Sequence, residues 1–445
     1  MLTVLGLGMI LCFMYLIMSR RLVPLVALTL IPVLFALIAW GLGYFIDDLA
    51  HIQLNGLGEM MLDGVKKLAP TGVMLLFAIL YFAIMIDTGL FDPSVKWILR
   101  LVKGDPLKVV VGTITLTLIV SLDGDGSTTY MICVAAMLPL YKRLGMSPLI
   151  MACLMMLASG IMNLTPWGGP TARAASALHV EPSDVFIPMI LPMICAIIWL
   201  YFLGFMYGRM ERKRLGIIEL DVSHGDSIQI SNNPEANRAH LRWFNGLLTL
   251  ALMVSLIMSL LPMPVLFMIA LCIALIVNYK DIDLQKRLIA NHAGSALNVV
   301  GIIFAAGIFT GILSGTGMVE AMSKELVAII PESMGPYLAP ITAIVSMPLT
   351  FFMSNDAFYF GVLPILSEAA VHYGIEPVEM ARASIVGQPV HLLSPLVPST
   401  YLLCGLAGIE FGQHQKFTIK WATITCIVML SASLIFGMFP LYSTI

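Results

Sequence analysis

Long apolar runs are the feature that most constrains what this chain can fold into. Residues 264–279 and 295–314 contain no charged side chain, and residues 183–207 contain one. A helix that crosses a membrane needs about 20 apolar residues, because the hydrocarbon core is roughly 30 Å thick. Of the 445 residues, 59% are hydrophobic and 11% are charged, compared with about 25% charged in soluble domains. We therefore expect an all-α polytopic protein of the plasma (inner) membrane, surrounded by membrane lipid.

The remaining composition argues against several functions. The net charge of −2 gives no reason to expect a nucleic-acid partner. The seven cysteines lie in apolar runs without a C-x-x-C pair, so neither disulfides nor a cysteine metal cluster is expected. The sequence has no Walker motif, and no nucleophile–base pair or His/Glu metal set stands out. We therefore predict no enzyme activity and no cofactor.

The apolar runs predict ten membrane spans, near residues 2–18, 22–46, 70–88, 148–179, 183–207, 243–261, 264–279, 295–314, 377–409 and 416–440. Lysine and arginine clusters orient these spans, since cytoplasmic loops are enriched in both residues. Clusters around Arg20, Lys142, Arg212, Lys286 and Lys416 are assigned to the cytoplasm. Both termini then lie outside, and the long polar stretch 208–242 is a cytoplasmic linker.

Two further apolar segments, 105–143 and 336–373, do not read as spans. Each carries polar residues at its middle, "SLDGDGSTTYM" (121–131) in one and "MSNDAF" (353–358) in the other. Each arm has about 15 residues, roughly 22 Å of helix, which is too short to cross. We expect two re-entrant hairpins, because irregular backbone at membrane depth is tolerated only where protein or a watery cavity surrounds it.

The two halves of the chain repeat each other at an offset of 229 residues. Residues 145–171 and 374–400 align without a gap and share seven identities, including Pro148 with Pro377 and Pro166 with Pro395. The chain crosses five predicted spans from the start of one copy to the start of the other, counting 148–179, and an odd number reverses their direction in the membrane. This is the inverted-repeat arrangement of secondary transporters.

Each copy also contains a helix that we expect to be broken, at "NLTPWGGPT" (163–171) and at "LLSPLVPST" (392–400). Each break has two prolines, which remove amide donors and kink a helix. Helix N-termini at the breaks and hairpin tips favour anions, while unwound carbonyls and aspartates favour cations. The sequence predicts one site for an anion together with a cation.

The run "NLTPWGGPTARAASAL" (163–178), together with the opening "MLTVLGLGMILCFMYLIMSRR", resembles the citrate–metal:proton symporter family of the ion transporter superfamily. The resemblance spans essentially the whole chain. It implies proton-driven uptake of citrate complexed with a divalent metal, Mg²⁺ or Ca²⁺, which travels as part of the substrate. It also implies a homodimer with a fixed scaffold domain and a transport domain that moves as an elevator.

Under this resemblance the chain divides into a scaffold domain (1–104 and 243–335), a transport domain (105–207 and 336–445) and the linker 208–242. The transport domain holds the inner hairpin 105–143, the broken helix 148–179, the outer hairpin 336–373 and the broken helix 377–409. The amphipathic segments 92–103 and 318–331 are interpreted as interfacial arms between the two domains.

Related dicarboxylate transporters carry Ser-Asn-Thr at both hairpin tips, where sodium binds. This chain has Leu-Asp-Gly-Asp-Gly-Ser-Thr at one tip and Ser-Asn-Asp-Ala at the other. The difference puts sodium coupling in doubt and adds carboxylates. A cation/proton antiporter and a sodium-coupled di- or tricarboxylate transporter of the same fold remain alternatives, and a channel is disfavoured by the repeats around interrupted helices.

The predicted site residues come from the tips and breaks. Substrate contacts are predicted from Gly126, Ser127, Thr128, Asn163, Thr165, Gly168, Gly169, Thr171, Arg173, Ser354, Asn355, Ser394, Ser399 and Thr400. Proton or metal coupling is predicted from Asp123, Asp125, Asp356 and His391, with Asp125 and Asp356 as possible contacts of the metal in the citrate complex.

Several of these residues have a second interpretation. Asp123 can instead cap the helix that begins near Ser127. Arg173 has a planar guanidinium suited to a substrate carboxylate, but its side chain can equally extend outward or pair with an acid. His391 can carry a proton or serve as a hydrogen-bonded structural residue.

Overall fold

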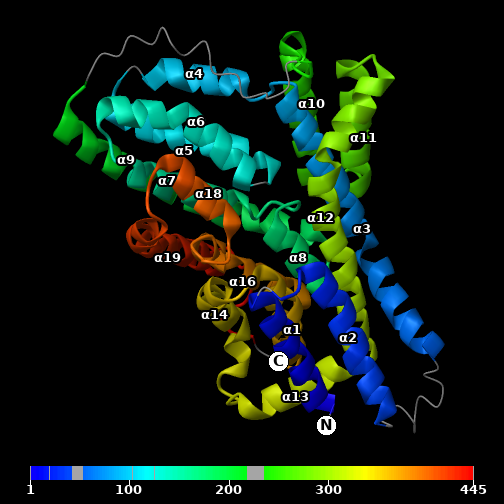
Figure 1. Ribbon diagram of the computed structural model, residues 1–445. Coiled ribbons are helices and arrows are strands. Elements are labelled where there is room, and N and C mark those ends of the chain that lie inside the picture. The colour runs from blue at the N-terminus through cyan, green and yellow to red at the C-terminus, as the bar shows by residue number, and fades with distance from the viewer. Residues whose placement is uncertain are drawn as a thin grey trace.

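The computed structural model describes residues 2–19, 21–42, 54–102, 104–124, 126–217 and 235–443. Within these ranges every regular element is a helix (Figure 1). The α-helices are α1 (Leu2–Met18), α2 (Pro24–Gly41), α3 (Leu54–Asp87), α4 (Asp92–Val102), α5 (Pro106–Val120), α6 (Gly126–Leu144), α7 (Pro148–Met162), α8 (Gly169–Leu178), α9 (Pro182–Leu215), α10 (Arg242–Ile257), α11 (Met263–Asn278), α12 (Ile282–Gly315), α13 (Met318–Ile329), α14 (Leu338–Phe352), α15 (Leu363–Val371), α16 (Pro377–Ser384), α17 (Gln388–His391), α18 (Pro398–Ala407) and α19 (Phe411–Ile435). Short tight turns lie between some of them, including η1 (Ser121–Asp123), η4 (Gly335–Tyr337), a π-helical turn (Ala357–Val362) and η6 (Ile385–Gly387).

Eight helices in the described part of the chain are long and apolar enough to cross a membrane. This set differs from the ten predicted spans. Segments 148–179 and 377–409 are divided by their prolines into shorter helices, and α1 and α11 have only 17 and 16 residues. Conversely, α5 with η1 and η4 with α14 reach 18 residues each, although they were predicted as hairpin arms. The chain is nevertheless a polytopic, all-helical membrane protein.

Helices α3 and α12 are the central pair, and each has 34 residues. Both are longer than the predicted spans 70–88 and 295–314. Their first halves carry charged side chains such as Asp63, Lys66 and Lys286, which end the apolar run but not the helix. Hydropathy therefore located only the apolar second half of each helix.

Glycines allow α3 and α12 to touch backbone to backbone. A Cβ atom built on Gly64 would lie 1.9 Å from the carbonyl oxygen of Gly307, and one on Gly311 would lie 2.4 Å from that of Met60. Small residues at a crossing permit this close approach in membrane proteins. With α2, α10 and α11, these two helices form what we call the α3–α12 group, at the right of Figure 1.

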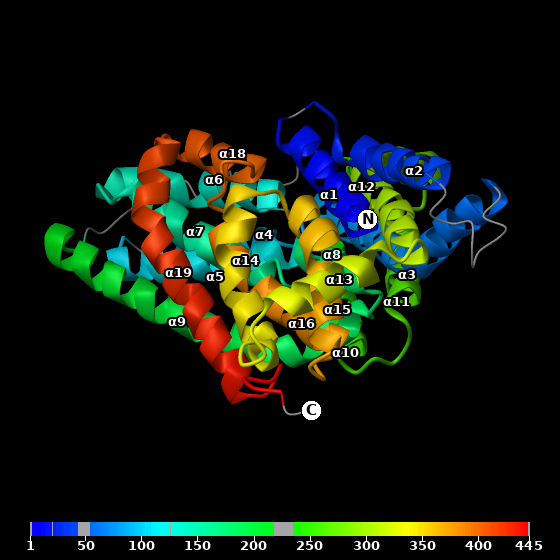
Figure 2. The same cartoon turned by 90° about the horizontal axis from the view of Figure 1, so that it is seen from below.

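The remaining long elements, α5 to α9 and α14 to α19, form a second body that we call the hairpin group (Figure 1). Helices α9 and α19 lie side by side along its outer edge, as the view from below also shows (Figure 2). Helix α4 packs on α5, and α13 packs on α1 and α15. These two helices cover most of the predicted interfacial arms 92–103 and 318–331.

Helix boundaries recur at the offset found in the sequence. Helix α7 begins at Pro148 and α16 at Pro377, which are 229 residues apart (377 − 148). The same interval separates the starts of α8 and α18 (398 − 169), their ends (407 − 178), and the starts of α9 and α19 (411 − 182). The two copies thus interrupt their helices at equivalent positions.

Candidate functional site

The first break separates α7 from α8 and is held by hydrogen bonds among its own residues. The amide of Gly168 donates to the carbonyl of Thr165 at 2.8 Å, and the Thr171 hydroxyl donates to the carbonyl of Leu164 at 2.9 Å. A Cβ atom on Gly168 would lie 2.1 Å from the carbonyl oxygen of Asn163. The turn therefore needs glycine for space.

The second break has the same design. The amide of Val397 donates to the carbonyl of Ser394 at 3.1 Å, the bond equivalent to Gly168–Thr165 at the 229-residue offset. The Thr400 hydroxyl donates to the Leu392 carbonyl, and the Ser394 hydroxyl accepts from the Leu396 amide. The threonine hydroxyls thus replace amide donors that the prolines remove, and the Ser394 hydroxyl accepts from an amide at the break.

The tip of the first hairpin rests against the first break. The Trp167 indole donates to the carbonyl of Leu122 at 2.9 Å, and its ring packs on Phe82 and Phe267 of the α3–α12 group. Gly124 has φ +76°, and a Cβ there would lie 2.9 Å from the Trp167 ring. Glycine is required at this tip both for its left-handed backbone and for its contact with Trp167.

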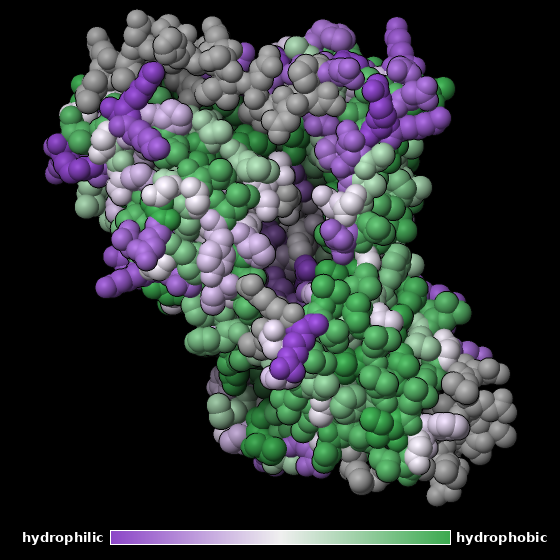
Figure 3. All heavy atoms as spheres, in the orientation of Figure 1, coloured by the Kyte–Doolittle hydropathy of each residue, from purple (hydrophilic) through white to green (hydrophobic). Residues whose placement is uncertain are grey.

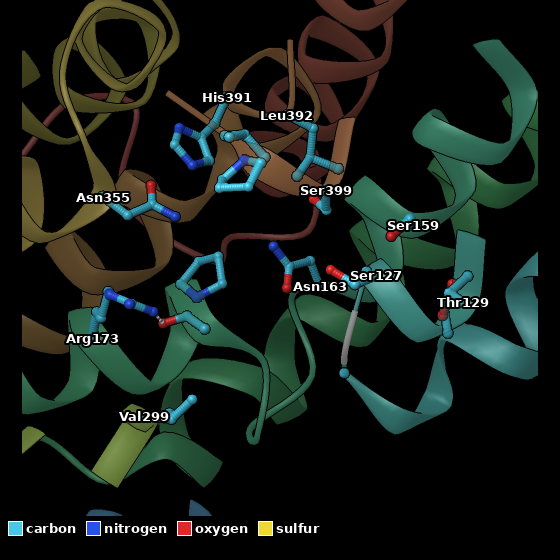
Figure 4. A pocket seen from close by; sticks show the side chains of 17 residues that line it. Ser127, Thr129, Ser159, Asn163, Arg173, Val299, Asn355, His391, Leu392 and Ser399 are labelled. Carbon is cyan, nitrogen blue, oxygen red and sulfur yellow. Dashed lines mark hydrogen bonds between the residues drawn. The ribbon is translucent and has the colours of Figure 1, made fainter. Parts of the chain in front are cut away.

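A cavity of about 470 Å³ lies where the tips and breaks meet. The polar side chains around it converge from separate elements (Figure 4). They belong to Ser121, Ser127, Thr129, Ser159, Asn163, Arg173, Asn355, His391 and Ser399. The volume is in the range of small-molecule sites.

Helix N-termini surround this cavity. Its lining includes Gly126 at the start of α6, Gly169 and Pro170 at the start of α8, and Pro398 and Ser399 at the start of α18. The N-caps of α8 and α18, Gly168 and Val397, make no side-chain capping bond. Amides and dipoles at such helix starts favour an anion in the cavity.

Arg173 is the basic side chain of the site, and it is already paired. Its Nε donates to Asp356 Oδ1 at 2.6 Å, and its NH1 donates to the Gly169 carbonyl at 3.1 Å. The side chains are only 17% and 10% exposed. Arg173 lines the cavity whereas Asp356 is not part of the lining, so the cavity meets the arginine of this pair and not the aspartate. The pair connects α8 to the tip of the second hairpin.

His391 and Asn355 complete the side of the site formed by the second half of the chain. His391 Nδ1 lies 2.6 Å from the Thr350 carbonyl. A carbonyl only accepts, so Nδ1 carries a proton and Nε2 is the nitrogen left to exchange one. The Asn355 carbonyl oxygen accepts from Gln388 at 3.3 Å, and Gln388 also donates to the Tyr359 hydroxyl. These bonds fix the tip of the second hairpin.

A second cavity of about 450 Å³ adjoins the first and shares Gly124, Ser127, Gly169, Arg173 and Val299 with it. It extends to the α3–α12 group, where His292 Nε2 and Asp87 Oδ2 lie 2.7 Å apart. The space-filling view shows a hollow between the two helix groups with hydrophilic surface inside it (Figure 3). The amide of Arg238, at the end of segment 235–238, donates to the carbonyl of Thr88, which is next to Asp87. This cavity therefore lies toward the linker side of the molecule.

The structure divides the predicted site residues into two sets. Those that line one or both cavities are Gly126, Ser127, Thr128, Asn163, Gly169, Arg173, Asn355, Ser399, His391 and Asp123. Outside the lining lie Thr165, Gly168, Thr171, Ser354, Asp356, Ser394 and Thr400. Most of these hold the breaks and tips in shape. Asp125 lies outside the described residues.

Two of the alternatives left open by the sequence can be addressed. Arg173 pairs with an acid and faces the cavity at the same time. Asp123 is 7% exposed, accepts from Thr129 of α6 at 3.3 Å, and lines the second cavity, so its bonding within the hairpin does not remove it from the site.

Sequence reasoning missed the contribution of the α3–α12 group, namely Phe82, Asp87, His292, Ser295 and Val299. The signal was present in "NHAGS" (291–295), a polar stretch placed before the predicted span. Since α12 in fact begins at Ile282, this stretch lies inside the helix and one of its turns faces the cavity.

The sequence matches the CitMHS family, described as citrate transporter, over residues 13–387. It is 60% identical over 440 residues to a "Citrate transporter" of Bacillus subtilis (strain 168), covering 98% of this chain and 99% of that protein. It is also 52% identical over 438 residues to the "Mg(2+)/citrate complex secondary transporter" of the same organism, with the same coverage.

Solved structures match at the level of the fold. The YdaH transporter of Alcanivorax borkumensis is similar with a TM-score of 0.53 and 13% identity, over 87% of this chain and 90% of that one. MtrF of Neisseria gonorrhoeae is similar with a TM-score of 0.59 and 14% identity, over 85% and 84%.

Proposed function

Because this chain belongs to the CitMHS family of citrate transporters, we propose that it is a secondary active transporter of citrate complexed with a divalent metal, Mg²⁺ or Ca²⁺, driven by protons. The observation that carries this function is the composition of the 470 Å³ cavity. It combines helix N-termini and Arg173, which suit a carboxylate, and Asp123 in the adjoining cavity adds a carboxylate that suits a cation.

The metal belongs to the substrate in this proposal. In the described part of the chain, no group of three or more His, Cys, Asp or Glu side chains could hold a metal ion. Mg²⁺ and Ca²⁺ take six or more oxygen ligands, and citrate itself supplies several. A site with single protein carboxylates suits a cation that arrives with most of its ligands.

The experiment that tests this function is citrate uptake into vesicles that contain the purified protein. We expect radiolabelled citrate to accumulate when Mg²⁺ or Ca²⁺ and an inward proton gradient are present, and to fall to background when the divalent metal is chelated. Protein-free vesicles are the control. Uptake that is unchanged by chelation would show that free citrate is the substrate, and uptake that follows a sodium gradient would favour a sodium-coupled transporter.

Coupling is proposed to use the carboxylates of the first hairpin tip, Asp125 first and Asp123 with it. An acid near the midplane is costly unless it has a function. A cation bound beside a carboxyl favours its ionised form, so these aspartates are proposed to release a proton when the metal complex arrives. We expect Asp125→Asn to lose proton-driven accumulation while retaining citrate exchange. A variant that concentrates citrate as the parent does, with the same pH dependence, would remove Asp125 from the coupling.

The larger arrangement is also a proposal. Equivalent helix boundaries at the 229-residue offset support two inverted repeats, and the hollow between the helix groups supports a transport domain (105–207 and 336–445) that moves as an elevator against a scaffold (1–104 and 243–335) of a homodimer. Both termini are placed outside and the linker 208–242 in the cytoplasm. Labelling of single cysteines at 142 and 325 from opposite sides of the membrane tests this orientation.

A further inference from the structure

The pairing of Arg173 bears on why a transporter should prefer metal-bound citrate. Among the described residues that line the two cavities, Arg173 is the one lysine or arginine. Its Nε is held by Asp356 at 2.6 Å, so its charge is balanced before any substrate arrives. The other acids of the second cavity are Asp123 and Asp87, and Oδ2 of Asp87 lies 2.7 Å from His292 Nε2.

The charge of the ligand decides how it fits such a site. Citrate carries about three negative charges at neutral pH, and a bound divalent cation leaves about one. A trianion in a site without net positive charge is repelled by the acids behind and beside it, and this repulsion is strong where water is excluded. A complex of low charge avoids the repulsion and can still use the helix N-termini and the free N–H groups of Arg173.

We infer that Asp356 sets the preference for metal-bound over free citrate, by balancing the charge of Arg173 without itself lining the cavity. The inference rests on the proposed function. It gives Asp356 a role in selecting the substrate that is separate from proton coupling and does not require contact with the metal. Asp356 is therefore a positioning residue, which acts on the ligand through Arg173.

The geometry favours this role over direct metal binding. Asp356 is not part of the lining of either cavity, and its side chain, paired with Arg173, is 10% exposed. The two residues come from opposite halves of the chain, 183 positions apart. A guanidinium with its Nε on one carboxylate keeps other N–H groups for a second carboxylate. The pair thus holds the arginine ready for citrate while cancelling its charge.

The test is equilibrium binding of radiolabelled citrate to the purified full-length protein, with Mg²⁺ or Ca²⁺ and with a chelator. The quantity measured is the ratio of the affinity for metal–citrate to that for free citrate. We expect Asp356→Asn to lower this ratio by about 10- to 100-fold, the scale of one hydrogen bond to a charged group, mainly because free citrate binds more tightly. Asp356→Glu, which keeps the charge, should retain the ratio of the parent.

Two controls separate charge balance from folding. The double variant Arg173→Gln/Asp356→Asn should not gain affinity for free citrate, because it has no unbalanced cation. The variant Asp92→Asn/Arg242→Gln removes another largely buried ion pair, with a 3.0 Å contact between α4 and α10. Neither residue lines either cavity, so this variant should leave the ratio unchanged. If Asp356→Asn does not fold, Asp356→Ala removes the same charge and gives the same readout.

The outcomes distinguish this inference from the proposed function. A parent that binds citrate equally well with and without metal overturns the proposed function and the inference with it. A parent that prefers the complex, together with an Asp356→Asn variant that keeps the same ratio or loses both affinities by the same factor, overturns only the role of Asp356.

Discussion

Replacing Arg173 by glutamine is expected to lower citrate uptake by roughly 100- to 1,000-fold, since one charged hydrogen bond to the substrate is lost and a buried acid loses its partner. Arg173 is the basic group of the cavity, and it makes two bonds that fix its position, to Asp356 and to the Gly169 carbonyl. Glutamine can reach neither partner with the same geometry and carries no charge. The measurement is initial uptake of metal–citrate into vesicles with matched amounts of folded protein.

Arg173→Lys serves as the graded control for this prediction. Lysine keeps the charge but has no planar fork, so we expect uptake between that of the parent and that of Arg173→Gln. Size-exclusion profiles of both variants establish that the protein is intact. If Arg173→Gln, present as folded protein, transports at more than about a tenth of the parental rate, Arg173 does not bind the substrate.

The second large effect concerns stability. We expect Gly64→Ala to destabilise the protein by about 1 to 3 kcal/mol, the usual cost of overpacking, and Gly64→Leu to prevent stable folding. The reason is that a Cβ on Gly64 would lie 1.9 Å from the Gly307 carbonyl oxygen and 2.9 Å from the Cα of Gly311. Both are backbone atoms, which cannot move aside without separating α3 from α12.

Gly58 provides a matched control on the same helix. A Cβ there meets no atom within 4 Å, so Gly58→Ala should be neutral or stabilising by up to about 1 kcal/mol, through helix propensity alone. The measurement is the thermal midpoint of the detergent-solubilised protein. Equal midpoints for Gly64→Ala and Gly58→Ala would show that α3 and α12 are not in backbone contact at Gly64.

Proline and glycine made much of this fold predictable. The pairs Pro166 with Pro170 and Pro395 with Pro398 stand at helix interruptions, because proline cannot continue a regular helix without losing a hydrogen bond. The 229-residue offset located equivalent helix starts for the same reason. Membership of the citrate transporter family, expected from "NLTPWGGPTARAASAL", is confirmed by the match over residues 13–387.

Other features depended on contacts that sequence order does not encode. The partner of Arg173 lies 183 positions away, and several acids were equally plausible. In the sequence, Trp167 was noted only as part of the family motif. Its hydrogen bond to the Leu122 carbonyl and its packing on Phe82 depend on how the two helix groups meet. His292 was missed because hydropathy detects apolar side chains only. Helix α12 continues through a turn that contains charged residues, since its backbone hydrogen bonds remain satisfied there.

The repeated backbone of the two breaks carries side chains that do not repeat. At the 229-residue offset the counterpart of Arg173 is Leu402, that of His391 is Met162, and that of Asn163 is Leu392. The two sides of the cavity therefore carry different side chains, and the guanidinium of Arg173 has no basic counterpart in the other repeat. We expect a bound ligand to have one preferred orientation. Citrate is prochiral, with two chemically identical carboxymethyl arms. We expect a citrate molecule bound in this cavity to place its two arms in different surroundings, so that the protein distinguishes them.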